Sequence, residues 1–412
     1  MSNTFVGGIK LPYMNPAPDI ISAPFKPTRI SLDIPDGYRV AVKHGDKIAI
    51  GDEVAVSDGG NPNILSGISG TVSVSHYEGQ QSVTVENNFC DTVSEKCVPL
   101  KKNINELSEA DLTEALLKMG IAPPSAGKKS PVCLIINCCE SDSHSSSVTR
   151  TLLEKTEEVI GGARILMKLL GAGKAICAVP KPMYKCANDL GCCINDSRMI
   201  KIRLVSGKYP QHEPHMLVSS LFNIEINPSV PVSDAGYPVV SAVLCAAVFD
   251  ALAKGLPFTS SIITVSEEHI ASGNYTVPFG TEINELIPLC GDFSEKPEKI
   301  QIGGIMTGKE TDGSDHTKPD TSAIILNKQK RQVKLRPCLH CGRCSSACPV
   351  RLQPSLIFEY SADGNHEITK KLDAEYCIAC GCCSSVCPAG IDLRAVILSE
   401  KAFITGKGAA YE

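Results

Sequence analysis

Two copies of one cysteine pattern carry the clearest chemistry in this sequence. They read "CLHCGRCSSACP", from Cys338 to Pro349, and "CIACGCCSSVCP", from Cys377 to Pro388. Both follow CxxCxxCxxxCP, the spacing of bacterial two-cluster ferredoxins, in which the fourth cysteine ligates the other cluster. The alternative for paired thiols is zinc. Because the whole pattern occurs twice, with a Cys-Pro each time, it predicts two 4Fe-4S clusters.

The crossed ligation of such ferredoxins assigns four cysteines to each cluster. One predicted set is Cys338, Cys341, Cys344 and Cys387, and the other is Cys377, Cys380, Cys383 and Cys348. Cys382 is left over. Neighbouring cubanes exchange single electrons, so this part of the chain is predicted to conduct electrons.

Composition places these motifs in an ordinary multidomain chain. The 412 residues are 43% hydrophobic and 21% charged, and the net charge of -5 gives no reason to expect nucleic-acid binding. The longest apolar run, "PVVSAVLCAAVF", is shorter than the roughly 20 residues of a transmembrane helix, and no secretory signal is evident. We therefore expect a cytoplasmic protein, in which 20 cysteines indicate metal or redox work rather than disulfides.

Four units are expected along the chain, of class α/β plus β. Short β-branched strands separated by Gly-Asp and Ser-Gly turns predict a barrel-sandwich hybrid in residues 1–100. Alternating strands and helices predict a Rossmann-like α/β domain in residues 105–245, with one helix over residues 147–173 broken at Gly161 and Gly162. A β-grasp unit (246–310), a linker (307–323) and the two-cluster ferredoxin domain (328–405) follow.

Two vicinal cysteine pairs outside the motifs are candidate redox thiols. Cys138 and Cys139 follow the apolar run of "LIINCCESDSH", beside two carboxylates that would raise a thiol pKa. Neighbouring strand residues point to opposite faces, so a disulfide between them would need a strained turn. Cys192 and Cys193 stand in "KCANDLGCC", which we expect to be a loop. For both pairs, packing of small side chains is the alternative.

The order of these parts resembles the RnfC family, whose α/β domain is similar to the flavin-binding subunit of respiratory complex I. The segments "GGIKLPYM", "GKYPQHEPHMLV", "VPFGTEINEL" and "GGIMTGKE" carry the resemblance beside the cysteine motifs, and it covers almost the whole chain. It implies a complex I flavoprotein-type α/β domain, an SLBB-like β-grasp unit and a site for FMN and NADH.

In that family the cofactor pocket combines a glycine-rich loop with an Asn-x-x-Glu-x-Glu-Pro strand end. Asn137, Glu140 and Asp142 fall on the asparagine and the two carboxylates, so the resemblance implies that they line a flavin and NADH pocket. The loop differs, because "GIAPPSAGKKS" (residues 120–130) has two prolines, which lack N-H groups. A pocket kept as scaffold is the alternative.

The resemblance implies an oxidoreductase component that takes electrons from a reduced carrier, with NADH acting through FMN, and passes them through the clusters to a partner reductase. The chain is also similar to PrdC-type proteins in length and cysteine content, which makes D-proline reductase a candidate partner and selenocysteine a candidate at a position written Cys. Two alternatives are a flavin-free conducting adaptor and a peripheral RnfC-type subunit of a membrane ferredoxin:NAD oxidoreductase. Whether the chain is itself an enzyme stays open.

Overall fold

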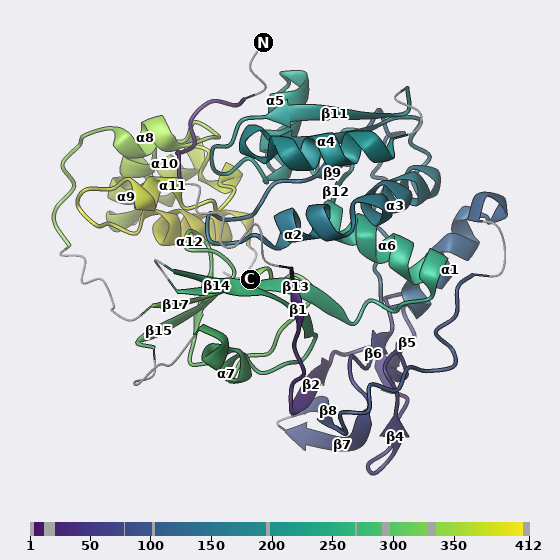
Figure 1. Ribbon diagram of the computed structural model, residues 1–412. Helices are drawn as coiled ribbons and strands as arrows, with labels where there is room; N and C mark the ends of the chain where they lie inside the picture. The colour runs from purple at the N-terminus through teal and green to yellow at the C-terminus, as the bar shows by residue number, and fades with distance from the viewer. Residues whose placement is uncertain are drawn as a thin grey trace.

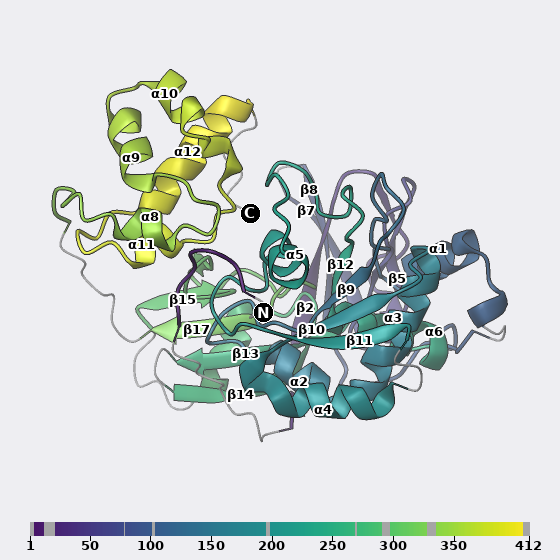
Figure 2. The same ribbon diagram turned by 90° about the horizontal axis from the view of Figure 1, so that it is seen from above.

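The structure, a computed structural model, describes residues 4–11, 21–77, 79–100, 104–194, 198–267, 270–290, 297–327 and 335–406. The first residues of the expected ferredoxin domain, 328–334, lie outside this part of the chain, as do the last residues of "GGIKLPYM". Figure 1 shows the described units side by side, and Figure 2 shows them from above.

The N-terminal region folds as two small antiparallel sheets, because β-branched residues alternate along its strands and bury one face. Ile30, Val54, Val72 and Val83 form the centre of that core. One sheet has the order β2-β8-β7-β4 and the other β3-β5-β6. Their bounds are β2 (Arg29–Ile34), β3 (Tyr38–Val40), β4 (Lys47–Ile48), β5 (Glu53–Ser57), β6 (Ile64–Leu65), β7 (Gly70–Tyr77) and β8 (Gln80–Asn87).

The α/β domain is built on a parallel four-stranded sheet of order β11-β10-β9-β12. Helices α1, α3, α4 and α6 bury their apolar sides on one face, and α5 covers the other. The strands are β9 (Leu134–Asn137), β10 (Ala175–Pro180), β11 (Ile200–Val205) and β12 (Val239–Ser241). The helices are α1 (Glu109–Lys118), α2 (Ser147–Glu154), α3 (Thr156–Leu169), α4 (Tyr184–Cys193), α5 (Pro214–Phe222) and α6 (Ala242–Lys254), with single 3-10 turns at Ile104–Glu106 and Lys181–Met183.

The helix predicted over residues 147–173 breaks at a different place from the one expected. Lys155, with φ −132° and ψ 40°, separates α2 from α3, and its ammonium lies 2.7 Å from the Asp250 carboxylate. Gly162 lies inside α3, where a Cβ would stand 1.7 Å from the carbonyl oxygen of Cys245. The glycines therefore allow α3 to pack closely on α6, and the prediction that they break the helix was wrong.

The loop expected around Cys192 and Cys193 is also wrong, because these residues end helix α4. Cys186 and Leu190, four residues apart, bury one side of that helix against the domain core. Burial of this face outweighs the weak helix propensity of Asn188 and Gly191.

A second, six-stranded sheet has the order β1-β14-β13-β17-β15-β16 and lies beside the α/β domain (Figure 1). It consists of β1 (Ala23–Pro24), β13 (Ser260–Glu267), β14 (Ile270–Pro278), β15 (Lys299–Ile302), β16 (Lys309–Thr311) and β17 (Ala323–Asn327), with α7 (Ile283–Leu286) and a 3-10 turn at Ile287–Cys290. Residues 307–323, expected as a linker, therefore contain β16 and lead into β17. Since α6 packs in the α/β core, this sheet unit begins and ends later than residues 246–310.

The C-terminal module is helical and carries both cysteine motifs. Its elements are α8 (Arg343–Ala347), α9 (Pro354–Ala362), α10 (His366–Lys371), a 3-10 turn at Ala374–Tyr376, α11 (Cys382–Ser385) and α12 (Leu393–Thr405). Leu352, Ile357, Leu393 and Ile397 pack behind the cysteines and form the core of the module. In Figure 2 the module stands to one side of the α/β domain.

The N-terminal segment, residues 4–11, lies between this module and the α/β domain. The Gly8 amide donates to the carbonyl oxygen of Ala347 at 2.9 Å, and Ile9 pairs with Tyr209 as an antiparallel bridge. Gly7 has φ 65°, and a Cβ there would stand 2.5 Å from the carbonyl oxygen of Cys348. Only glycine allows this close passage across the cysteine loop.

Within the described residues, no helix combines the length and the apolar character that crossing a membrane would require.

Candidate functional site

The eight motif cysteines line two separate cavities in the C-terminal module. The outer cavity is lined by Cys338, Cys341 and Cys344 of the first motif and by Cys387 of the second. The inner cavity is lined by Cys377, Cys380 and Cys383 of the second motif and by Cys348 of the first. Each cavity thus brings together three thiols from one motif and the fourth thiol from the other.

The two loops have matching backbone conformations. His340 and Ala379, each before the second cysteine of its motif, have φ 49° and 58°, and Gly342 and Gly381 follow with φ 71° and 75°. This path turns backbone amides toward sulfur: Cys338 accepts from the amide of His340 at 3.5 Å, and Cys377 accepts from that of Ala379 at 3.4 Å. Amides that donate to sulfur stabilise thiolate ligands.

The two cavities differ in how deeply they lie. In the outer set Cys341 is exposed and only Cys344 is buried, whereas in the inner set Cys348, Cys377 and Cys383 are buried. Two cations brace the inner loop: Arg394 Nε donates to the carbonyl oxygen of Ala379, and Lys401 Nζ to that of Cys377, both at 2.7 Å. The inner cavity is the one that faces the α/β domain, because the Tyr209 hydroxyl donates to the carbonyl oxygen of Cys380 at 2.8 Å.

A third cavity, of about 60 Å³, opens where β9, β10 and β11 end. The carboxyl edge of a parallel sheet is where α/β proteins bind ligands. Its lining includes Cys139, Glu140, Asp142, Ser143, Pro180, Met183, Lys208, Tyr209, Gln211 and His212. Tyr209 lines this edge and also touches the inner cysteine loop, so the two sites share a residue.

Glu140 lies at this edge with its carboxylate turned onto the first turn of α2. It accepts from the Thr149 amide at 2.6 Å, from the Thr149 hydroxyl at 2.7 Å and from the Ser145 hydroxyl at 3.1 Å. Burial raises the pKa of Glu140 to about 7, although these hydrogen bonds act in the opposite direction. The carboxylate therefore occupies a helix N-terminus that would otherwise suit an external anion.

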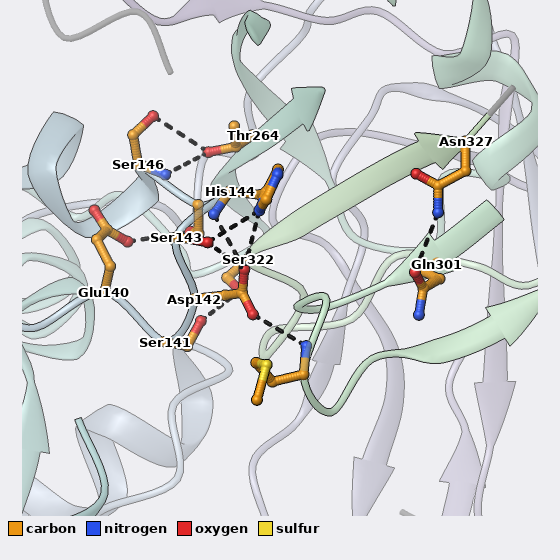
Figure 3. A network of polar contacts seen from close by, with 12 residues as sticks. Glu140, Ser141, Asp142, Ser143, His144, Ser146, Thr264, Gln301, Ser322 and Asn327 are labelled. Carbon is orange, nitrogen blue, oxygen red and sulfur yellow. Dashed lines mark hydrogen bonds and ion pairs between the residues drawn. The ribbon is translucent and has the colours of Figure 1, made fainter. Parts of the chain in front are cut away.

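Asp142 joins the edge to the second sheet. One carboxylate oxygen accepts from the amide of Met306 at 3.2 Å and the other from the amide of His144 at 3.1 Å, as Figure 3 shows. A Cβ at Gly304 would stand 2.4 Å from this carboxylate, so the two units are in close contact. Ser146 continues the network by donating its amide to the Thr264 hydroxyl at 2.9 Å.

Asn137 is held by its own chain as well. Its amide nitrogen donates to the carbonyl oxygen of His212 at 2.8 Å, and its oxygen accepts from the Cys139 amide at 3.0 Å. His212 itself is enclosed, which lowers its pKa, and no described residue bonds its Nδ1 atom. The residues expected to line the pocket are thus together, and His212 supplies its unpartnered polar atom.

Cys138 and Cys139 point to opposite faces of the sheet. Cys138 packs in the core beneath α3 and α6, and Cys139 packs in the core beneath α5. A hydrogen bond with Cys177, followed by burial, raises the pKa of Cys138, and burial raises that of Cys139. Because a reactive cysteine needs an accessible thiolate, these positions favour packing.

The second candidate pair differs in exposure. Cys192 is exposed at the end of α4, and Cys193 is partly buried, with a pKa raised by burial and then by Glu157. Cys186 is buried in the domain core. These three cysteines lie on the helical face of the domain, apart from the pocket lining.

The loop at residues 120–130 already uses the groups that could hold a phosphate. The Gly127 amide donates to the Ser125 hydroxyl at 3.1 Å, and the Lys128 amide donates to the Asp234 carboxylate at 3.2 Å. The Lys128 ammonium lies 3.1 Å from the same carboxylate. With prolines at 123 and 124, these residues do not fit a flavin phosphate, because a phosphate cradle needs free N-H groups that converge.

Two family descriptions match this chain. The Nuo51 FMN-binding domain matches residues 116–249, and the 4Fe-4S dicluster domain matches residues 334–391. These matches support FMN and two 4Fe-4S clusters as the cofactors. The four-thiol sets with amide donors to sulfur fit the clusters, whereas the phosphate loop departs from what FMN requires.

Curated relatives match over most of the chain, and they are RnfC components of larger complexes. The one from the proton-translocating ferredoxin:NAD(+) oxidoreductase complex of Clostridium ljungdahlii is 29% identical, over 88% of this chain and 82% of the relative. The one from the Na(+)-translocating complex of Acetobacterium woodii is 26% identical, over 87% of each. A crystal structure of an NAD+-reducing NiFe-hydrogenase aligns with TM-score 0.48 and 14% identity, over 74% of this chain and 63% of that one, a likeness too low to carry an argument.

Proposed function

Because this chain is an RnfC-like protein, we propose that it is a peripheral electron-conducting subunit of an ion-translocating ferredoxin:NAD oxidoreductase type of complex. The observation that carries the proposal is the direct contact between the pocket edge of the α/β domain and the inner cysteine loop, through Tyr209 and the Cys380 carbonyl. The relatives reported above belong to such complexes, and neither name mentions D-proline reductase, so no such partner is proposed.

The proposed ligands are the two crossed cysteine sets: Cys348, Cys377, Cys380 and Cys383 for the inner cluster, and Cys338, Cys341, Cys344 and Cys387 for the outer cluster. A bound 4Fe-4S cluster exchanges one electron at a time. The chain's own residues do the rest: backbone amides orient the thiolates, and Leu352 and Ile357 keep water away from the inner set. Arg394 and Lys401 place positive charge beside it.

The geometry supports an order of sites in which the inner cluster exchanges electrons with the sheet edge and the outer cluster with a partner. Cys341 is exposed, with Leu335 and Leu339 at 77% and 58% exposure beside it in sequence. Arg336 and Arg343 are also exposed there. An apolar centre with a basic surround suits a redox carrier whose docking face is acidic.

We also propose the finer domain assignments. The two N-terminal sheets are taken as the barrel-sandwich hybrid, the β-grasp SLBB-like unit as part of the six-stranded sheet, and the α/β domain as the complex I flavoprotein type. Asn137, Glu140 and Asp142 remain the proposed boundary of its cofactor pocket.

A second candidate function is a flavin-free conducting adaptor. The observation that favours it is the loop at residues 120–130, where Ser125 and Asp234 satisfy the amides that a phosphate would need. In this case the α/β domain docks partners, and electrons enter the inner cluster from another protein.

Anaerobic spectroscopy on the purified full chain separates the two functions. Bleaching of the cluster absorbance by NADH alone would support a working flavin and NADH pocket and would contradict the adaptor. Bleaching by a reduced ferredoxin but not by NADH is the result expected of the adaptor. A chain that holds clusters which neither donor bleaches would contradict both functions.

A further inference from the structure

The two cysteine motifs differ at one position in a way that changes the surroundings of a cluster. The residue before the third cysteine is Arg343 in the first motif and Cys382 in the second. Arg343 is exposed, whereas Cys382 has no exposed surface. Equivalent positions of a repeated loop therefore carry a charged surface group on the outer side and an enclosed thiol on the inner side.

Cys382 lies where the module meets the rest of the protein. It packs with Tyr209 and Ala347, and Met306 closes the same cluster of side chains. It also lines the inner cavity together with the four proposed ligands. The thiol is thus walled off from water and is held against the cysteine loop.

Within this enclosure the side chain of Cys382 forms a hydrogen bond with the side chain of Cys380. A cysteine that ligates iron has lost its proton, so its sulfur can only accept. If Cys380 is a ligand, as the proposed function holds, the single proton between the two sulfurs belongs to Cys382. The bond then runs from the Cys382 thiol to the ligand sulfur.

We propose that Cys382 is a positioning residue that donates an S-H···S hydrogen bond to Cys380 and thereby raises the reduction potential of the inner cluster. Reduction adds negative charge to a cluster and its sulfurs, and a donor stabilises the reduced form more than the oxidised form. The outer cluster receives no matching donor, because Arg343 turns to solvent. The two clusters are therefore tuned separately within one repeat.

Two other roles for Cys382 make different predictions. As a ligand in place of Cys380 or Cys383, it would be needed for iron to bind. As packing alone, it could be replaced by alanine without an electrostatic consequence. If the smaller alanine side chain admitted water, the water would favour the more charged reduced form and shift the potential upward, opposite in sign to the loss of a donor.

The test uses the full chain with Cys382→Ala and Cys382→Ser, purified anaerobically. Iron and sulfide are assayed, and the clusters are titrated with EPR detection. We expect the parent's iron content in both variants. One midpoint potential should move negative in Cys382→Ala and by a smaller shift in Cys382→Ser, because a hydroxyl still donates, while the other midpoint stays unchanged. The exchangeable proton that ENDOR detects near the reduced inner cluster should disappear in Cys382→Ala.

The matched control is Cys245→Ala, which removes an equally buried thiol from the α/β core. It should leave both midpoints unchanged. Loss of one cluster's iron in Cys382→Ala would identify a ligand, and an unchanged or more positive midpoint would identify packing, so either result overturns the inference. Failure of the proposed function is distinguishable, since a parent chain without two iron-sulfur clusters would reveal it before any variant is made.

Discussion

At the scale of single residues, the crossing of the cysteine sets is the most specific claim. Cys387 lines the outer cavity although it belongs to the second motif, and Cys348 lines the inner cavity although it belongs to the first. The spacing of the cysteines predicts this pairing, since crossed ligation accompanies the Cys-Pro end of each motif. Spacing does not reveal depth, because Cys341 and Cys380 occupy equivalent positions and only the fold makes one exposed.

Serine variants test the crossing. Cys387→Ser should lose the same cluster as Cys341→Ser, and Cys348→Ser the same cluster as Cys380→Ser, because each pair shares a cavity. Iron content should fall by about half in each variant, and EPR spectra of the reduced variants should match within pairs. Spectra that match within motifs instead would show that each motif holds its own cluster.

Glu140 predicts a pH dependence of stability. Its pKa in the folded chain is raised to about 7 by burial, above the 4.5 of an exposed glutamate. Between these values the folded chain holds a proton that the unfolded chain has released, so this residue makes stability fall as pH rises from about 4.5 to about 7. The loss is at most about 3 kcal/mol, and it persists above pH 7.

Glu140→Gln should remove this loss. The variant's melting temperature relative to the parent should be more favourable at pH 8 than at pH 5, as measured by scanning calorimetry. Glu114→Gln, which changes an exposed helix pair with Lys118, serves as the control and should give the same difference at both pH values. An equal difference at both pH values for Glu140→Gln would show that its carboxylate ionises normally.

At the scale of elements, sequence periodicity predicts β9, β10 and β11 well, because apolar runs with β-branched residues can bury both faces only in a parallel sheet. It fails where tertiary contacts decide. Gly162 reads as a helix breaker but serves the approach of α3 to α6, and α4 forms over a stretch rich in weak helix formers. The short strand β16 lies in a segment whose polar composition indicates a linker, since pairing with β15 is not visible in sequence.

The loop at residues 120–130 shows a similar limit. Its prolines are visible in the sequence, but the bond from the Lys128 amide to Asp234 joins residues more than a hundred positions apart. Only the fold shows that a carboxylate of the chain itself already holds this amide.

Flavin binding tests the consequence for this loop. The parent should bind FMN and riboflavin with nearly equal affinity, because its loop offers the phosphate few free donors. Asp234→Ala frees the amide and ammonium of Lys128, and we expect FMN then to be favoured over riboflavin by about tenfold, the worth of one charge-assisted hydrogen bond. Fluorescence titration of both flavins measures this ratio.

The control for the loop is Asp234→Ala combined with Lys128→Ala, which should return the ratio toward that of the parent. A parent that prefers FMN by a hundredfold or more would contradict the account of the loop.

At the scale of the whole molecule, the units form a continuous path of contacts. Tyr209 links the sheet edge to the inner cysteine loop, Asp142 links it to the second sheet, and residues 4–11 lie against the module. The order of the units along the chain was predictable from motifs and composition. Their contacts were not, because nothing in the sequence around Tyr209 indicates a contact, and Cys382 shows only as a surplus cysteine.

The proposed docking face gives a prediction at this scale. Arg336→Glu with Arg343→Glu should slow electron exchange with an acidic ferredoxin by about tenfold or more at low salt, because like charges then oppose encounter. Stopped-flow absorbance follows the exchange. Arg203→Glu, at an exposed position on β11, is the control and should have little effect. Equal rates for all three proteins would place the docking face elsewhere.

The central claim, two 4Fe-4S clusters held by crossed cysteine sets, is tested most directly by metal analysis with EPR on the anaerobically purified full chain. The account predicts iron and sulfide for two 4Fe-4S clusters per chain. It also predicts that the fully reduced protein gives a spectrum broadened by coupling between two neighbouring clusters. Stoichiometric zinc in place of iron, or the signal of a single isolated cluster, would contradict it.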